Sequence, residues 1–275
     1  MIVLDGKKIA DEKLASVRQC VSASGMEAAL AVVLVGNDPA SELYVSLKKK
    51  TAEKIGIDVR VYRFADDASR SAIAQCIAFL NVDPETHGII VQLPLPTHLV
   101  AGDIVGMIAP EKDVDGFHPE NQEKFLAGRE RYEPVFPKAI IELLQATDAA
   151  LTGKSAVIIG KSDVFDRVMA AALSREKVIA TFVRCEDIVS QRAQIRTADI
   201  VITACGMPRI ITADMVKDGA IVIDGGIVRE KDSVVGDVDQ SSFVDREGFL
   251  SPVPGGVGPV TIACLLENVY VASRR

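Results

Sequence analysis

The chain has 275 residues, 48% of them hydrophobic and 25% charged, which is typical of a globular protein with one large domain or two of ordinary size. A net charge of −7 and an isoelectric point near 5.1 argue against nucleic acid as a partner, because nothing offsets phosphate repulsion. No apolar run approaches a membrane span, and the N-terminus lacks the apolar core of a signal peptide. We therefore expect a cytoplasmic protein without a membrane partner.

Cysteine and histidine are few and scattered. The five cysteines are odd in number and show no paired spacing, which indicates free thiols in a reducing compartment; they are Cys20, Cys76, Cys185, Cys205 and Cys264. Together with the three histidines they show none of the close spacings of zinc sites, so we expect no metal.

The first strong element is a strand that leads into a helix. The valine-rich run 29–35 is short enough for a strand buried on both faces. Gly36 and Asn37 end it, Asp38 is a suitable N-cap, and Pro39 suits the first helical position. Helical spacing then predicts an inward stripe made of Ala40, Tyr44, Leu47, Thr51 and Ile55.

Lys48 lies at the edge of this stripe, one turn beyond Tyr44. Open α/β sheets bind ligands at the carboxyl ends of their strands, so a lysine beside a tyrosine on this helix is a candidate site. The alternative is an ordinary solvated surface lysine.

The rest of the N-terminal half alternates helices and strands in the order of a parallel sheet. We expect helices at 7–24, 69–81 and 98–108, and strands at 57–63 and 87–92. The prolines of Leu93-Pro94-Leu95-Pro96 end the last of these strands, which places Gln92 at the same edge as Tyr44 and Lys48. Segment 119–136 reads as irregular, and Pro137 opens a helix.

The second half repeats the alternation and predicts a doubly wound unit of the nucleotide-binding type. A helix at 164–175 is expected among strands at 156–159, 178–183, 199–203 and 220–224. A glycine- and proline-rich segment at 254–259 introduces a last helix at 260–272. The predicted fold is thus α/β with two domains flanking a cleft: residues 1–136, completed by a helix within 258–275, and a Rossmann-like domain at 137–257.

Three segments carry possible chemistry. Asp115 could offer its carboxylate to a planar ligand with two adjacent N–H donors, although aspartate before glycine is also common in turns. The run 254–259 specifies a fixed backbone path without large side chains, which permits close approach to a ligand. At Gly160 a strand ends before a helix whose N–H groups could hold a pyrophosphate, but the full glycine fingerprint is absent.

Taken together, four motifs resemble one family over the whole chain, in order. They are Val35-Gly36-Asn37-Asp38-Pro39-Ala40-Ser41 with Tyr44 and Lys48, Val91-Gln92-Leu93-Pro94-Leu95-Pro96, Lys112-Asp113-Val114-Asp115-Gly116-Phe117, and Pro252-Val253-Pro254-Gly255-Gly256-Val257-Gly258-Pro259. The sequence resembles the bifunctional methylenetetrahydrofolate dehydrogenase/cyclohydrolases of the FolD type. The resemblance implies oxidation of methylene-tetrahydrofolate with NADP, NAD being possible, then hydrolysis of the methenyl product to formyl-tetrahydrofolate by a homodimer.

The resemblance also implies roles by position. Lys48 would be the catalytic lysine, Gln92 would orient it, Tyr44 would pack on the folate, and Asp115 would pair with the pterin. The folate slot would further involve Leu93, Pro254, Gly255, Gly256 and Val257. The coenzyme would contact Gly160, Lys161, Ser162, Arg184, Cys185 and Ile227.

Departures from the family pattern collect on the dinucleotide side. Asp166 stands where the family has a glycine and Val168 where it has a proline, while Arg184-Cys185 replaces His-Ser. A carboxylate near a pyrophosphate disfavours binding, whereas Lys161 and Arg184 could hold a 2′-phosphate. At 135–139 and 121–123 two further family motifs are altered. A cyclohydrolase with a degraded nucleotide site and a non-catalytic folate-binding protein are therefore the alternatives to a bifunctional enzyme.

Overall fold

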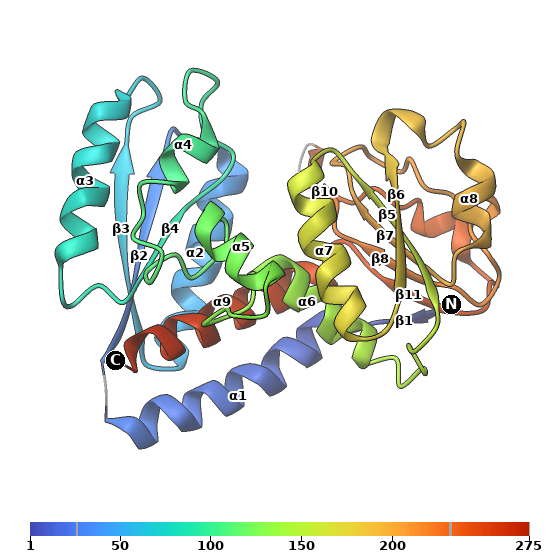
Figure 1. Cartoon of the computed structure of the whole chain (residues 1–275), viewed down its shortest axis with the longest axis horizontal. Helices are drawn as coiled ribbons and strands as arrows, with labels where there is room; N and C mark the ends of the chain where they lie inside the picture. The colour runs from blue at the N-terminus through green and yellow to red at the C-terminus, as the bar shows by residue number, and fades with distance from the viewer. Residues whose placement is uncertain (26, 231–232, 275) are drawn as a thin grey trace. The chain divides into compact units, whose positions relative to one another are not determined.

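The computed structural model describes residues 1–25, 27–230 and 233–274, which fold into two compact α/β units (Figure 1). One unit consists of Asp11–Val135 and Ile262–Arg275, and we call it the lysine unit because it contains Lys48. The other consists of Met1–Ala10 and Phe136–Thr261, and we call it the glycine unit because it contains Gly160. The predicted α/β class, with parallel sheets, is confirmed.

The lysine unit is built on a parallel three-stranded sheet in the order β3-β2-β4. Its strands are β2 (Ala28–Val35), β3 (Ile57–Phe64) and β4 (Gly88–Val91). Helix α1 (Gly6–Ser24) precedes these strands, α2 (Pro39–Lys54) and α3 (Arg70–Val82) connect them, and α4 (Ala101–Val105) follows β4. All eight residues of β2 are buried, as the unbroken apolar run predicted for a central strand covered on both faces.

On one face of this sheet, alternate residues of β2 pack against α3 and α4. Ile73, Ile77 and Leu80 of α3 are fully buried there, and their spacing places them on one face of the helix. The helix expected at 98–108 is shorter than predicted, because only 101–105 is α-helical.

Helix α2 begins as predicted but buries a different face. The Asp38 carboxylate accepts hydrogen bonds from the backbone N–H and hydroxyl of Ser41, both at 2.8 Å. The predicted stripe is wrong, because Leu47 is 43% exposed, while the buried residues are Ser41, Val45 and Ala52. Counting apolar residues misplaced the stripe by one position, since the true stripe contains Ser41, a polar residue that donates to the N-cap Asp38. Lys48 lies on the true stripe, between Val45 and Ala52.

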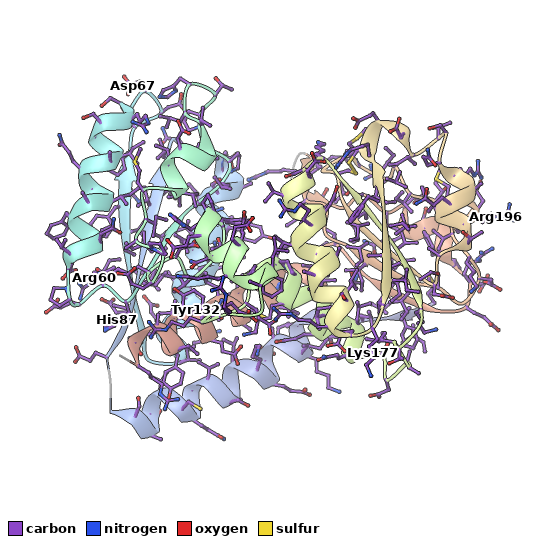
Figure 2. All side chains as sticks on the ribbon, in the orientation of Figure 1. Arg60, Asp67, His87, Tyr132, Lys177 and Arg196 are labelled. Carbon is purple, nitrogen blue, oxygen red and sulfur yellow. A yellow bond between two sulfur atoms is a disulfide. The ribbon has the colours of Figure 1, made fainter. Side chains whose placement is uncertain are left out.

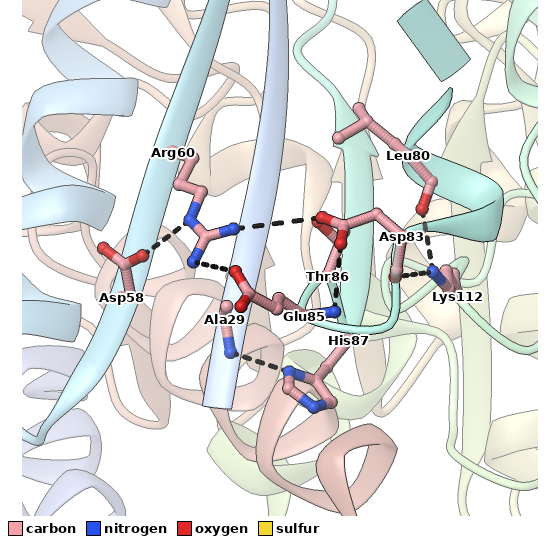
Figure 3. A network of polar contacts seen from close by, with 9 residues as sticks. All are labelled: Ala29, Asp58, Arg60, Leu80, Asp83, Glu85, Thr86, His87 and Lys112. Atoms are coloured by element: carbon pink, nitrogen blue, oxygen red, sulfur yellow. Dashed lines mark hydrogen bonds and ion pairs between the residues drawn. The ribbon is translucent and has the colours of Figure 1, made fainter. Parts of the chain in front are cut away.

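A buried lysine fixes the chain that follows β4. Lys112 is 1% exposed, and its amine donates to the carbonyls of Leu80 and Asp83, both at 2.7 Å, where α3 ends (Figure 3). The same network holds Arg60 among the carboxylates of Asp58, Asp83 and Glu85 (Figure 3). A cation at the end of a helix stabilises its free carbonyls.

Segment 119–136 is not irregular throughout, because α5 (Pro119–Leu126) occupies its first part. His118 caps this helix and Pro119 stands at its first position. Only Phe125 of α5 is buried, so the sequence lacked the repeated apolar spacing that would have revealed the helix. The next helix, α6 (Val135–Gln145), begins two residues before Pro137 rather than at it.

The glycine unit contains a six-stranded parallel sheet in the order β1-β11-β8-β7-β5-β6. The predicted strands appear as β5 (Ser155–Gly160), β6 (Ile179–Arg184), β7 (Ile200–Ala204) and β8 (Ile221–Asp224), with α7 (Asp163–Arg175) and α8 (Arg192–Thr197) as connections. The chain passes from β5 to β6 on one side and to β7 on the other, so β5 lies at the topological switch point.

Several short elements of the glycine unit were not predicted. They are β1 (Ile2–Val3), β9 (Val228–Glu230), β10 (Ser233–Val235), β11 (Phe249–Ser251) and the 3₁₀ turns η1 (Cys185–Asp187), η2 (Ala213–Met215) and η3 (Gln240–Phe243). Segments of two to four residues show too little periodicity to be detected. Strand β1 joins the amino terminus to this sheet through β11.

The last helix, α9 (Val257–Ser273), begins in the glycine unit and ends in the lysine unit. Its Asn268 is buried, and the side-chain amide donates to the carbonyls of Val114 and Glu133, both at 2.9 Å. This amide thus ties the C-terminal helix to the loop that contains Asp115. Among the described residues no helix is long and apolar enough to cross a membrane.

The expectation of five free thiols is wrong, because Cys185 and Cys205 form a disulfide. Arg184 and Ala204 both pair in register with Gly160, the last residue of β5. Each cysteine is therefore the first residue beyond this point, on strands that flank β5. The segments that follow β6 and β7 lie close together where β5 ends, and the Cα atoms of the two cysteines are 5.9 Å apart. A separation of 20 residues gave no sign of this in the sequence.

We predict that alkylation of the protein unfolded in guanidinium without reductant modifies three cysteines, Cys20, Cys76 and Cys264. Unfolding removes protection by burial, so only the disulfide can shield the other two cysteines. After reduction, all five should react. Intact mass spectrometry counts the added groups, and five groups without reductant would contradict the disulfide.

Candidate functional site

The centre of the lysine unit's candidate site is a hydrogen bond between Lys48 and Gln92. Lys48 comes from α2, which follows β2, and Gln92 directly follows β4, the parallel neighbour of β2. The Lys48 amine donates to Gln92 Oε1 at 2.9 Å. Gln92 Nε2 donates to the Leu93 carbonyl at 2.7 Å, which fixes the amide with its oxygen towards the lysine. The predicted proximity of Lys48 and Gln92 is thus present in the structure.

Burial shifts the pKa values of the ionisable groups here. Desolvation lowers the pKa of Lys48, and the nearby Asp115 carboxylate opposes that shift. Desolvation also raises the pKa of Asp115 to about 6, against the attraction of Lys48. Burial raises the pKa of Tyr44 as well. Lys48 thus combines a weakened hold on its proton with a fixed position, which suits a general base.

A second set of hydrogen bonds holds the loop of Asp115. Asp113 is 1% exposed and accepts from the backbone N–H of His118 at 2.8 Å and the Asn121 amide at 2.9 Å. Tyr132, labelled in Figure 2, donates its hydroxyl to the Glu111 carbonyl at 2.8 Å. Asp113 therefore stabilises the loop, and Asp115 is the carboxylate that lies near Lys48.

In the glycine unit the end of β5 is covered by side chains of α7. A side chain at Gly160 would place its Cβ 2.9 Å from Asp166 Oδ1 and 3.2 Å from the Phe165 ring. Asp166 is 3% exposed, and its other oxygen accepts from Arg184 Nη1 at 2.5 Å. Arg184 also bonds Asp163 through Nη2. Ser162 caps α7, and Lys161 beside it is exposed.

The loop of Pro254, Gly255, Gly256 and Val257 also lies in the glycine unit. Gly256 is a packing glycine, because a Cβ would approach the Pro252 carbonyl oxygen to 2.5 Å. Gly255 has φ +102° and open space on its side-chain face. Val257 begins α9. The composition of this loop is thus explained in part by packing and in part by backbone conformation.

Comparison with known proteins places both halves of the chain. Residues 4–115 match the model of the tetrahydrofolate dehydrogenase/cyclohydrolase catalytic domain, and residues 134–275 match that of the NAD(P)-binding domain of the same family. The chain belongs to the tetrahydrofolate dehydrogenase/cyclohydrolase family. The resemblance that the four motifs suggested is confirmed.

Individual relatives support this over the full length. The bifunctional protein FolD of Moorella thermoacetica is 43% identical, with 99% of both chains covered, and that of Bacillus subtilis is 39% identical, with 99% and 98% covered. The crystal structure of the Campylobacter jejuni FolD enzyme has a TM-score of 0.92 at 39% identity, with 100% of this chain and 99% of that chain covered. A Trypanosoma brucei FolD structure, in complex with NADP and an inhibitor, has a TM-score of 0.94 at 29% identity, with 100% and 98% covered.

Among family residues predicted from the sequence, the structure brings Lys48, Gln92 and Asp115 together. Tyr44 lies one turn before Lys48 on α2 and is partly buried, and Leu93 supplies the carbonyl that orients Gln92. In the other unit, Ile227 is 42% exposed in the loop after β8. Cys185 is 4% exposed and its sulfur is bonded to Cys205, so this residue has no free thiol.

The residues at the end of β5 fit a dinucleotide despite the departures. Asp166 is buried against Gly160 rather than directed outward, and Arg184 offsets its charge. Lys161 is exposed, and among the described residues no acidic group pairs with it. The amino end of α7 and Lys161 are thus the groups that would receive the phosphates.

Two aspartates that the sequence analysis did not single out organise the neighbouring loops. Asp224, at the end of β8, accepts from the backbone N–H groups of Gly226, Asp237 and Val238, each at 3.0 Å. Asp237 accepts from the Cys205 N–H at 2.6 Å and the Thr203 hydroxyl at 2.7 Å. Both are fully buried. The signal was present in the sequence, because each aspartate adjoins glycine beside an apolar segment.

We predict opposite effects of two substitutions on the pKa of Lys48. Asp115→Asn removes the charge that supports the ammonium form and should lower this pKa further. Gln92→Glu places a carboxylate beside the amine and should raise the Lys48 pKa. An NMR titration of the Lys48 side-chain carbon resonances measures both.

A Lys48 pKa that rises in Asp115→Asn would contradict the electrostatic coupling described here.

Proposed function

We propose that this chain oxidises 5,10-methylene-tetrahydrofolate to the methenyl form and hydrolyses that product to 10-formyl-tetrahydrofolate. The observation that supports this most directly is the Lys48–Gln92 hydrogen bond beside Asp115. A surface lysine has neither a desolvated amine nor an oriented acceptor. The position of Lys48 therefore favours a catalytic role over the solvated alternative.

In the hydrolytic step Lys48 acts as the base. The methenyl carbon is cationic, so it accepts the oxygen of an attacking water while the neutral Lys48 amine takes a proton from that water. The bond between this carbon and N5 then breaks as the hydroxyl proton is lost and N5 takes up a proton, which leaves the formyl group on N10. The proton held by Lys48 is released to solvent. Because desolvation lowers the lysine pKa, a larger fraction of the amine is neutral near pH 7.

The neighbouring groups bind and orient. Gln92 accepts one N–H of Lys48 in either protonation state, which holds the amine without supplying a charge. The Asp115 carboxylate accepts from paired N–H groups of the pterin. Tyr44 packs its ring on the folate. We also propose that the loop of Pro254–Val257 contributes to folate binding, as the resemblance implies.

For the oxidative step we propose NADP as the coenzyme, with NAD as the alternative. When bound, it accepts the hydride that the methylene carbon loses. Gly160, Ser162 and the first N–H groups of α7 would receive the pyrophosphate, Lys161 a further phosphate, and Ile227 would contact the coenzyme after β8. As the resemblance implies, we expect a cytoplasmic homodimer.

We predict that Lys48→Met lowers the rate of methenyl-tetrahydrofolate hydrolysis at least about a hundredfold, because the variant has no base at this position. Methionine is unbranched and only one atom shorter than lysine, so the fold should be retained. The decay of methenyl absorbance measures the rate, and circular dichroism checks the fold.

Lys49→Met is the matched control on the same helix and should hydrolyse at the original rate. Hydrolysis by Lys48→Met at that rate would show that Lys48 is not the base.

A further inference from the structure

Arg184 occupies the position in the glycine unit where coenzyme choice is expected to be made. It ends β6, the strand next to β5, and pairs in register with Gly160. In dinucleotide-binding units the end of this second strand lies beside the adenosine ribose, where a carboxylate favours a free 2′-hydroxyl and an arginine favours a 2′-phosphate. The sequence alone suggests an arginine available for NADP.

The structure shows that this guanidinium already has anionic partners. Asp166 Oδ2 accepts from Nη1 at 2.5 Å, and Asp163 accepts from Nη2. Both carboxylates belong to the first turn of α7, so they are held beside Arg184 without any ligand. A guanidinium in two charge-assisted hydrogen bonds has lost most of its attraction for a further anion.

Asp166 is placed to keep this arrangement. Its side chain is 4% exposed, and its Oδ1 is buried without a hydrogen-bond partner among the described residues. Oδ1 lies against Gly160, where a Cβ would meet it at 2.9 Å. Without Arg184 this carboxylate would be buried with no counter-charge, which is costly. A ligand that drew Arg184 away from Asp166 would therefore have to offset this cost.

Charges around the cluster act in the same direction. Glu186 and Asp187 follow Arg184 at the same edge and are exposed. With Asp163 and Asp166 they are four acidic residues, against three cations in the same two segments, Lys161, Arg167 and Arg184. A 2′-phosphate brings about two negative charges into this field, whereas a 2′-hydroxyl brings none.

We propose that Asp163 and Asp166 set the coenzyme preference of this enzyme by holding Arg184 as their counter-ion, so that the 2′-phosphate of NADP gains little affinity over NAD. This inference rests on the dehydrogenase half of the proposed function. It names Asp166 as a specificity-determining residue that acts through Arg184, and it treats Lys161 as the cation that remains for phosphate.

Calorimetric titration of NAD and NADP into the unmodified protein and Asp166→Asn tests the proposal. The unmodified protein should bind the two within about threefold of each other. Asp166→Asn removes one carboxylate while keeping its size, which frees part of the guanidinium. It should tighten NADP binding about tenfold and change NAD binding less than about twofold, since tenfold is the effect of a single partly screened charge contact.

Two further variants isolate the cause. Asp166→Asn combined with Arg184→Gln should lose the gain for NADP, because the gain requires the freed guanidinium. Asp187→Asn removes a neighbouring negative charge without releasing Arg184, since among the described residues Asp187 makes no ion pair with it. This control should affect NADP binding less than about twofold.

Equal tightening of NAD and NADP by Asp166→Asn would overturn the proposal and show that Asp166 acts at the pyrophosphate. No change in either, or a gain that survives the loss of Arg184, would also overturn it. Hydrolysis of methenyl-tetrahydrofolate, measured alongside, shows that each variant is intact. If the unmodified protein and the variants hydrolyse methenyl-tetrahydrofolate but none of them binds either dinucleotide, this proposal is rejected together with the dehydrogenase half of the proposed function.

Discussion

The parallel pairing of β2 with β4 is the constraint on which the candidate site depends. In a parallel pair both strands end at the same edge, so the helix after β2 and the turn after β4 begin beside each other. Lys48 is delivered by that helix and Gln92 by that turn, and a 2.9 Å hydrogen bond joins them. An antiparallel pair would place these residues at opposite edges.

Two lysines of the lysine unit show how burial produces different outcomes. Lys112 is surrounded by protein, and its amine is held by the carbonyls of Leu80 and Asp83 at the end of α3. Lys48 is only partly buried, and the bonded acceptor that orients it is the neutral amide oxygen of Gln92. The first arrangement stabilises an ammonium and anchors a loop. The second leaves the proton easier to remove, which is what a base requires.

The glycine unit uses charge pairing where its family pattern uses a glycine. Asp166 would oppose a dinucleotide if it faced outward, but it is buried and paired with Arg184. Asp224 and Asp237 are buried in the same unit and are satisfied mainly by backbone N–H groups. The disulfide between Cys185 and Cys205 links the segments that follow β6 and β7, the two strands beside β5. Asp166, Arg184 and Cys185, three of the departures from the family pattern, therefore belong to one local structure at the end of β5.

The sequence by itself determined the alternation of strands and helices and the family. It also determined that Lys48 and Gln92 lie at the same edge of the sheet, where the strands end. These follow from apolar runs, proline and glycine positions, and the geometry of parallel sheets, all of which are local or general. It did not determine which face α2 buries, the helix α5, or the strands of two or three residues. Leu47 is apolar yet exposed, and α5 buries only Phe125, so local composition misled in both cases.

Only the tertiary structure decided which side chains that are distant in the sequence contact each other. Arg184 and Asp166 are 18 residues apart, and Cys185 and Cys205 are 20 apart, with no spacing that marks either pair. The cysteine pair forms because β6 and β7 flank β5 and end level with Gly160. The Arg184–Asp166 pair forms because β6 ends level with Gly160, from which the chain enters α7. Strand order brings together residues that are distant in the chain, and a single sequence contains no local signal of that order.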